Sequence, residues 1–240
     1  MPSPGIKRAV IDRVDIDTVL DLKLDSTLRS RERQQIPPGE TWFTVLEGAQ
    51  RAIVTAPHAT RPFRDGVSRF SDGGGTAELA VALHKVCGVT VMHTTWDSPS
   101  DPNYYDDNDF KLRLRDLIRD KTPVIVLDLH GSHAYRPYEL DVGTMNGRSL
   151  LGRTALVNAL VDAFRREGIF NISDNFFPAA RQQTVVKFAS AAGVPAIQME
   201  LSALRVSPSS GDEGAHKFAQ TLQAIAEFLG GLQACSRTNH

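Results

Sequence analysis

Three short apolar segments, each typical of a β-strand, end in side chains that can bind a metal ion or move a proton. The three final residues are His58, His130 and Glu200. In open α/β sheets, ligands bind just outside the carboxyl ends of the strands. One histidine at a strand end is usually a hydrogen-bonded structural residue, but three such endings in one chain favour a functional site.

The alternation of side chains along a strand suggests how two of these residues work. It places Asp128 on the same face as His130, where a carboxylate can orient a metal-bound imidazole. It also places Glu200 on the polar face of its strand, which suits a general base next to a water that a metal activates. The structural alternatives are a simple Asp–His pair and a buried salt bridge from Glu200 to Arg181 or Arg205.

A third protein ligand is expected, because zinc in hydrolases commonly binds two histidines and one carboxylate and keeps one position open. Asp65, Asp72 and Glu78 all follow His58. Asp72 lies in a glycine-rich loop that can fold back towards His58. Glu78 lies in the first turn of a predicted helix, where the helix dipole alone favours a carboxylate. We therefore expect Asp72 to be the ligand.

Cations near these residues are candidates for binding a substrate carboxylate, because arginine matches carboxylate geometry with two parallel hydrogen bonds. The leading candidates are close in sequence to the two histidines: Arg61, Arg64 and Arg136. Two further candidates come from other loops and helix starts: Lys111 and Arg181.

The elements that must position these residues alternate along the chain. Strands are predicted at 42–46, 52–55, 89–92, 124–127, 139–144 and 196–201, and helices at 76–87, 110–121, 149–167, 183–192 and 215–232. This order predicts an α/β three-layer sandwich with a central mixed, mainly parallel sheet. The length of 240 residues fits a single domain, 1–240, in which 1–40 form a peripheral N-terminal segment.

The bulk composition excludes several classes of protein. The net charge is −1, which gives no electrostatic argument for nucleic acid or an anionic membrane as a partner. No apolar stretch approaches the ~20 residues needed to span a bilayer. Cys87 and Cys235 show no metal-type spacing, and Met1–Asp21 contains no signal-peptide core. A cytoplasmic protein with a small-molecule substrate is the expectation, and the oligomeric state is left open.

Taken together, these segments resemble a known family. Pro57-His58-Ala59, Asp72 before a helix, 127–131 (Leu-Asp-Leu-His-Gly) and 197–201 (Ile-Gln-Met-Glu-Leu) occur in the order seen in N-formylglutamate amidohydrolase-like proteins. That family is similar in fold to the zinc carboxypeptidases and aspartoacylases. The resemblance covers roughly residues 50–205. It implies a carboxypeptidase-like (phosphorylase/hydrolase-like) fold and one Zn²⁺ ion.

The resemblance also implies roles for residues. His58 and His130 would bind zinc with an acidic residue near Asp72, and Glu200 would be the general acid/base. The implied substrate is an N-formyl or N-acyl amino acid, or a small peptide-like amide. The sequence departs from the pattern in two places. Arg61 replaces the glutamate of the carboxypeptidase His-x-x-Glu pair, and the loop 71–75 lacks an Asp-rich segment.

Three other interpretations compete with this one. Binuclear manganese ureohydrolases use an Asp-x-His-x-Asp segment, but Ser132 takes the place of its second aspartate. A serine hydrolase is disfavoured because the chain has no Gly-x-Ser-x-Gly elbow. A non-catalytic ligand-binding or regulatory domain on the same scaffold stays open, because a fold does not determine a function.

Overall fold

A seven-stranded sheet forms the centre of the protein in the computed structural model, which describes residues 24–237. The strand order is β1-β5-β2-β6-β9-β7-β8. The strands are β1 Phe43–Leu46, β2 Gln50–Ala56, β5 Val89–Thr94, β6 Ile125–Ser132, β7 Leu140–Gly143, β8 Ile172–Asp174 and β9 Ala196–Ser202. A separate two-stranded hairpin consists of β3 Phe63–Arg64 and β4 Val67–Ser68.

The four central strands β5, β2, β6 and β9 run parallel, while β1 and β7 pair antiparallel to their inner neighbours. The expected mixed, mainly parallel sheet is therefore confirmed. From β2 the chain first passes to β5 on one side, and then crosses to β6 on the other side. The carboxyl ends of β2 and β6 thus flank the switch point of the sheet, where open α/β sheets bind their ligands.

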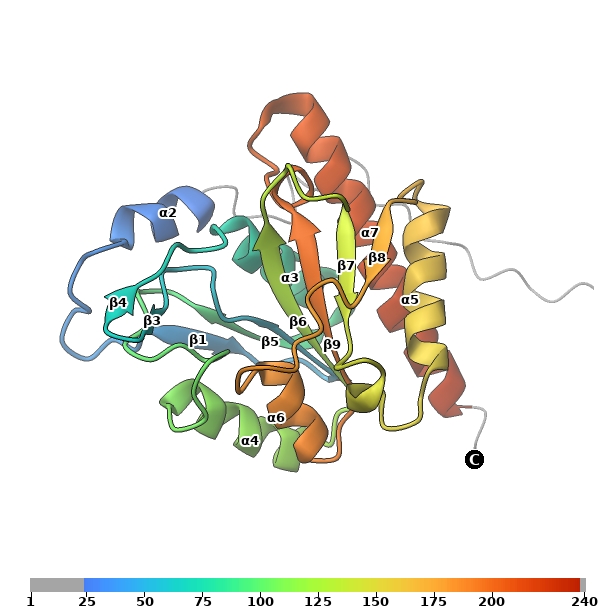
Figure 1. Ribbon diagram of the computed structural model, residues 1–240, viewed down its shortest axis with the longest axis horizontal. Coiled ribbons are helices and arrows are strands. Elements are labelled where there is room, and N and C mark those ends of the chain that lie inside the picture. The colour runs from blue at the N-terminus through green and yellow to red at the C-terminus, as the bar shows by residue number, and fades with distance from the viewer. Residues whose placement is uncertain (1–23, 238–240) are drawn as a thin grey trace, which may run out of the picture.

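Helices cover both faces of the sheet (Figure 1). On one face lie α3 Gly75–Cys87, α5 Ala155–Arg166 and α7 Gly211–Arg237, with α2 Leu24–Arg31 against α3. On the other face lie α4 Asp109–Lys121 and α6 Val185–Ala191. Two short 3₁₀ turns complete the elements, η1 Arg148–Leu150 and η2 Ala203–Arg205. None of the helices among residues 24–237 is long and apolar enough to cross a membrane.

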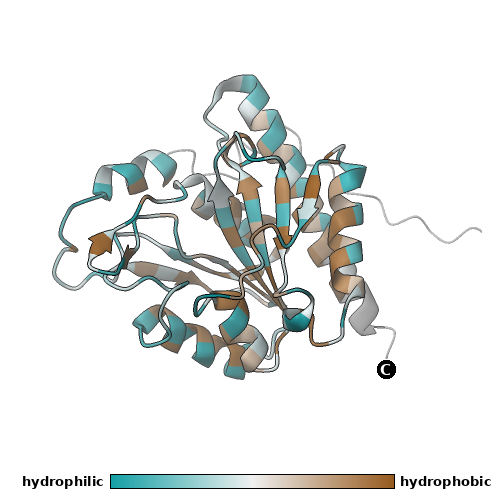
Figure 2. Ribbon diagram, viewed as in Figure 1, coloured by the Kyte–Doolittle hydropathy of each residue, from teal (hydrophilic) through white to brown (hydrophobic). Residues whose placement is uncertain are grey.

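The hydrophobic core is divided by the sheet into two clusters. Fully buried strands supply side chains to both clusters, as expected for strands covered on two faces. The larger cluster lies under α3, α5 and α7, and the smaller one lies under α4 and α6. In Figure 2 brown, hydrophobic bands lie along the central strands and along the helices beside them, and teal, hydrophilic positions are frequent on the helices and loops.

Some elements differ from the prediction. The helix predicted at 149–167 starts only at Ala155, because Leu151 adopts a positive φ of 52° after η1. The expected peripheral N-terminal segment, 1–40, contains α2, which was not predicted, and buried Leu28 packs that helix onto the core. The strands β3, β4 and β8 were not predicted. The expectation for 1–23 lies outside the described residues.

Candidate metal centre and active-site cavity

Three side chains converge at the switch point of the sheet. His58 follows β2, His130 lies on β6, and Asp72 lies in the loop before α3. The Asp72 Oδ2 atom is 2.8 Å from His130 Nδ1 and 3.8 Å from His58 Nδ1. The ligand atoms of the three residues all lie within 4.8 Å of one another. The structure thus brings together the two histidines and the carboxylate that the sequence singled out.

The Asp72 loop reaches this position by a close backbone approach. The Asp72 N–H group donates to the carbonyl of His58 at 2.8 Å, so the loop folds back onto the end of β2. A Cβ atom added at Gly131 would lie 2.6 Å from the Asp72 carbonyl oxygen. A glycine is therefore required directly after His130. Glu78 is not part of the cluster, and its carboxylate accepts a hydrogen bond from the Asp25 backbone N–H at 3.1 Å.

The outer nitrogens of both histidines face buried carboxylates. His58 Nε2 is 2.7 Å from Asp101 Oδ1, and His130 Nε2 is 3.1 Å from Asp128 Oδ2. Asp128 also accepts a hydrogen bond from the Thr55 hydroxyl at 2.6 Å. A carboxylate on the outer nitrogen fixes the orientation and tautomer of a metal-binding imidazole. Asp128 occupies its expected position, whereas sequence reasoning missed Asp101.

Asn103 connects the two supporting carboxylates. Its side-chain amide donates to Asp128 at 2.9 Å, and its backbone N–H donates to Asp101 at 2.8 Å. Its amide oxygen accepts the backbone N–H of Val185 at the start of α6. The orientation of both histidines therefore depends on the polar loop before α4. No motif in the sequence pointed to Asn103, because the partners of its side chain, Asp128 and Val185, are distant in the chain.

The charges around the cluster favour a cation. Burial alone would raise the pKa values of Asp101 and Asp128, but the neighbouring histidines lower them below the usual range. Burial alone would likewise lower the pKa of His130, but Asp128 and Asp72 raise it well above its usual value. Two imidazole nitrogens and one carboxylate oxygen match the donor set of zinc in hydrolases. The residues therefore fit a zinc ion.

Glu200 lies on β9, directly across from His130 in the parallel register. Its Oε1 atom accepts a hydrogen bond from the Gln198 amide at 2.8 Å. Burial raises the pKa of Glu200 to about 7, although His130 acts in the opposite direction. The alternative salt bridge is not formed with the two arginines considered: Arg205 pairs with Glu139 at 2.6 Å, and Arg181 is exposed.

A cavity of about 410 Å³ opens over these residues. Among its lining residues are two members of the cluster, His58 and Asp72, together with Asp101 and Glu200. The third member, His130, lies next to the lining residue Gly131. Arg64 and Arg136 also line it, as does Arg69, which sequence reasoning had not selected. The cavity places a candidate metal centre, a carboxylate with a raised pKa and several guanidinium groups around one space.

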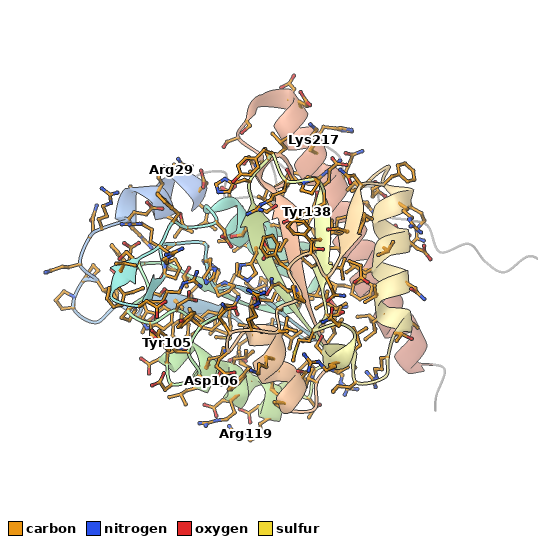
Figure 3. The ribbon with its side chains drawn as sticks, viewed as in Figure 1. Arg29, Tyr105, Asp106, Arg119, Tyr138 and Lys217 are labelled. Carbon is orange, nitrogen blue, oxygen red and sulfur yellow. The ribbon has the colours of Figure 1, made fainter. Side chains whose placement is uncertain are left out.

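The other three predicted cations lie elsewhere. The Arg61 guanidinium donates to the Arg69 carbonyl at 3.2 Å and is not among the lining residues. Lys111 is buried and donates to the carbonyl of Gln183 at 2.8 Å and to Asp106 at 2.9 Å. Arg181 is likewise absent from the lining. Lys111 thus has a structural explanation, and Figure 3 labels its partner Asp106 on the loop that leads into α4.

The fold and the site together define an α/β fold of the zinc carboxypeptidase type with a candidate metal centre at its switch point. No family model matches the sequence, and no curated protein matches it significantly. Solved structures do match. N-formylglutamate amidohydrolase from Ralstonia eutropha JMP134 aligns with a TM-score of 0.51 and 17% identity, over 79% of this chain and 98% of that chain.

Two further structures show the same likeness. A bacteriophage poly-gamma-glutamate hydrolase aligns with a TM-score of 0.51 and 16% identity, over 88% of this chain and 98% of that chain. A metallo-carboxypeptidase from Burkholderia cenocepacia aligns with a TM-score of 0.52 and 14% identity, over 89% of this chain and 69% of that chain. At these identities the likeness establishes the fold. The resemblance inferred from the sequence is therefore confirmed for the fold.

Proposed function

We propose that the protein is a zinc-dependent amidohydrolase that cleaves the amide bond of an N-acyl amino acid or a small peptide-like amide. The observation that carries the proposal is the convergence of His58, Asp72 and His130 beside Glu200. Three of these residues, His58, Asp72 and Glu200, line one cavity. Three matching structures support it, because their names describe an amidohydrolase, a hydrolase of poly-gamma-glutamate and a carboxypeptidase.

The proposed chemistry divides between the ion and the chain. A zinc ion held by His58, Asp72 and His130 would lower the pKa of water and polarise the amide carbonyl. Asp101 and Asp128 hold the two imidazoles in orientation through their outer nitrogens. Glu200 accepts the proton of the attacking water and passes it to the departing nitrogen. The carbon–nitrogen bond breaks, and a carboxylic acid and an amine are released.

The direct test is to measure metal content and turnover on the same sample. Purified protein is expected to contain about one zinc per chain and to release amine from a panel of N-acyl amino acids. Mass spectrometry of the metal and a colorimetric amine assay provide the two measurements. Stoichiometric zinc without turnover of any amide would favour the non-catalytic binding domain, and a second metal per chain would contradict the one-ion site.

Arg136 is the best-placed candidate for binding a substrate carboxylate. It is half-buried on the cavity wall, and its guanidinium carbon lies 5.1 Å from the centre of the Phe177 ring. Arg64 also lines the cavity, but it already pairs with Asp101 at 3.3 Å. In the described part of the chain, no salt bridge to a carboxylate occupies Arg136.

Replacing Arg136 with alanine is expected to raise KM for N-acyl amino acids by about 10–100-fold, because hydrogen bonds to charged groups contribute roughly 1.5–3 kcal/mol. The kcat value should change much less, and substrates with an amide-capped carboxylate should lose little. Steady-state kinetics on both substrate forms measures this difference. Arg181→Ala is the matched control, because Arg181 is exposed and does not line the cavity. Equal increases in KM for both substrate forms would show that Arg136 does not bind the substrate carboxylate.

A further inference from the structure

The segment between His58 and Asp72 presents apolar side chains to solvent at the edge of the cavity. Phe70 lines the cavity and is 91% exposed. Val67 is 50% exposed and pairs with Arg64 across the β3–β4 hairpin. Cross-strand partners share a face of the ladder, so Val67 lies on the face of Arg64, which also lines the cavity. In Figure 2 the hairpin carries a brown segment among paler and teal neighbours.

Folding does not account for this exposure, because a side chain that stays in water contributes almost no burial energy. The hairpin is held by other contacts. The Phe63 N–H donates to the Ser98 carbonyl at 3.2 Å, and the Asp101 N–H donates to the Phe63 carbonyl at 3.0 Å. Arg64 adds the ion pair to Asp101. Exposed apolar groups that border a cleft are typical of ligand-binding surfaces.

The strand order places this surface opposite Arg136. The hairpin follows β2 and is bonded to the segment after β5, so it lies on the β5–β2 side of the metal cluster. Arg136 follows β6, and Phe177 is held by a hydrogen bond from its N–H to Asp141 on β7, so both lie on the other side. A substrate amide centred at the cluster therefore extends in two directions. Its carboxylate end would face Arg136, and its acyl end would face Phe70.

We infer that Phe70 and Val67 form a binding surface for an apolar acyl group that is several carbons longer than formyl. This inference rests on the proposed function and specifies its substrate class as N-alkanoyl amino acids. The cavity volume of about 410 Å³ is within the range of pockets that bury drug-sized ligands. A formyl group carries no methylene that could cover these side chains, whereas an alkanoyl chain that covers them would remove their apolar surface from water.

The test is a series of N-acyl derivatives of one amino acid, with formyl, acetyl, butanoyl and hexanoyl groups. Each methylene that becomes fully buried adds about fourfold to binding. Because the surface is open on one side, we expect kcat/KM to rise about 10–100-fold from acetyl to hexanoyl. In Phe70→Ala this ratio should fall below about 5, and Phe70→Leu should restore part of it. Leu112→Ala is the matched control, because Leu112 is 43% exposed on α4 and does not line the cavity.

A binding measurement separates this inference from the proposed reaction. Calorimetry with the acetyl and hexanoyl compounds on zinc-loaded Glu200→Gln protein, with and without Phe70→Ala, reports chain-length preference without turnover. If no amide is cleaved but the hexanoyl compound binds more tightly than the acetyl compound, and this preference depends on Phe70, then the proposed reaction is wrong and the proposed acyl-binding surface is supported. If formyl or acetyl compounds are preferred, or if Phe70→Ala leaves the hexanoyl-to-acetyl ratio unchanged, the acyl surface is overturned.

Discussion

Replacing either His58 or His130 with alanine is expected to lower zinc affinity by more than about 100-fold. Changes to the groups that only support a metal ligand already cost about 10–100-fold, and these variants remove a ligand itself. The His130 variant also leaves Asp128 and Asp72 without their shared imidazole partner. Competition with a chromophoric chelator measures the affinity, and metal analysis after dialysis measures occupancy.

His84→Ala provides the matched control for these variants. His84 lies on α3 and its Nδ1 atom is 2.8 Å from the Val89 carbonyl oxygen, outside the cluster. It should retain wild-type zinc affinity even if it lowers stability slightly. Full zinc occupancy in both His58→Ala and His130→Ala, under conditions where wild-type protein binds one ion, would show that the ion is held elsewhere.

Replacing Glu200 with glutamine is expected to reduce kcat by roughly 10²–10⁴-fold, the usual contribution of acid–base catalysis, while zinc stays bound. The amide keeps the shape of the side chain but cannot accept the proton of water. Single-turnover kinetics and metal analysis on the same preparation separate chemistry from metal loss. Glu213→Gln is the matched control, because Glu213 is an exposed residue that pairs with Lys217 at the surface. If Glu200→Gln turned over substrate at the wild-type rate, Glu200 would have a structural role and would not be the general base.

The pH dependence of the reaction follows from the same residue. Burial raises the pKa of Glu200 to about 7, and only the ionised carboxylate accepts a proton. The rate should therefore fall as the pH drops below about 7, and Glu200→Gln should lose this acid limb. The raised pKa also means that the folded state holds the proton more tightly than the unfolded chain between pH 4.5 and about 7. Over that range the ionising carboxyl costs stability as pH rises, so Glu200→Gln should be no less stable than wild type at pH 8.

Residues at the ends of regular strands could be located from the sequence. His130, Asp128 and Glu200 follow from period-two alternation and from the position of strand ends in open α/β sheets. The parallel order also follows from alternating elements, because parallel strands need crossover connections. These inferences are local, since each depends on a few neighbouring residues or on the order of elements.

Residues that act through long-range contacts could not be located. Asp101 and Asn103 belong to a polar loop with no periodicity. Asp101 contacts His58, which lies 43 residues earlier in the chain, and Asn103 donates to Asp128, which lies 25 residues later. Lys111 illustrates the opposite error. A lysine at a helix start near a polar loop suggests substrate binding, but its amine is buried against carbonyls 72 and 73 residues away.

The hydrogen bonds between the β3–β4 hairpin and the segment 98–101 couple the shape of the cavity edge to the orientation of the metal ligand His58. Asp101, which orients His58, is bonded through its own N–H to the hairpin carbonyl of Phe63 and through its carboxylate to Arg64. Shortening the hairpin to admit bulkier ligands would therefore loosen the support of a metal ligand. The wall that carries Arg136 has no such connection to Asp101 through the described ion pairs. Directed evolution of ligand preference should tolerate substitutions in that wall at positions other than Arg136, and reject deletions in the hairpin.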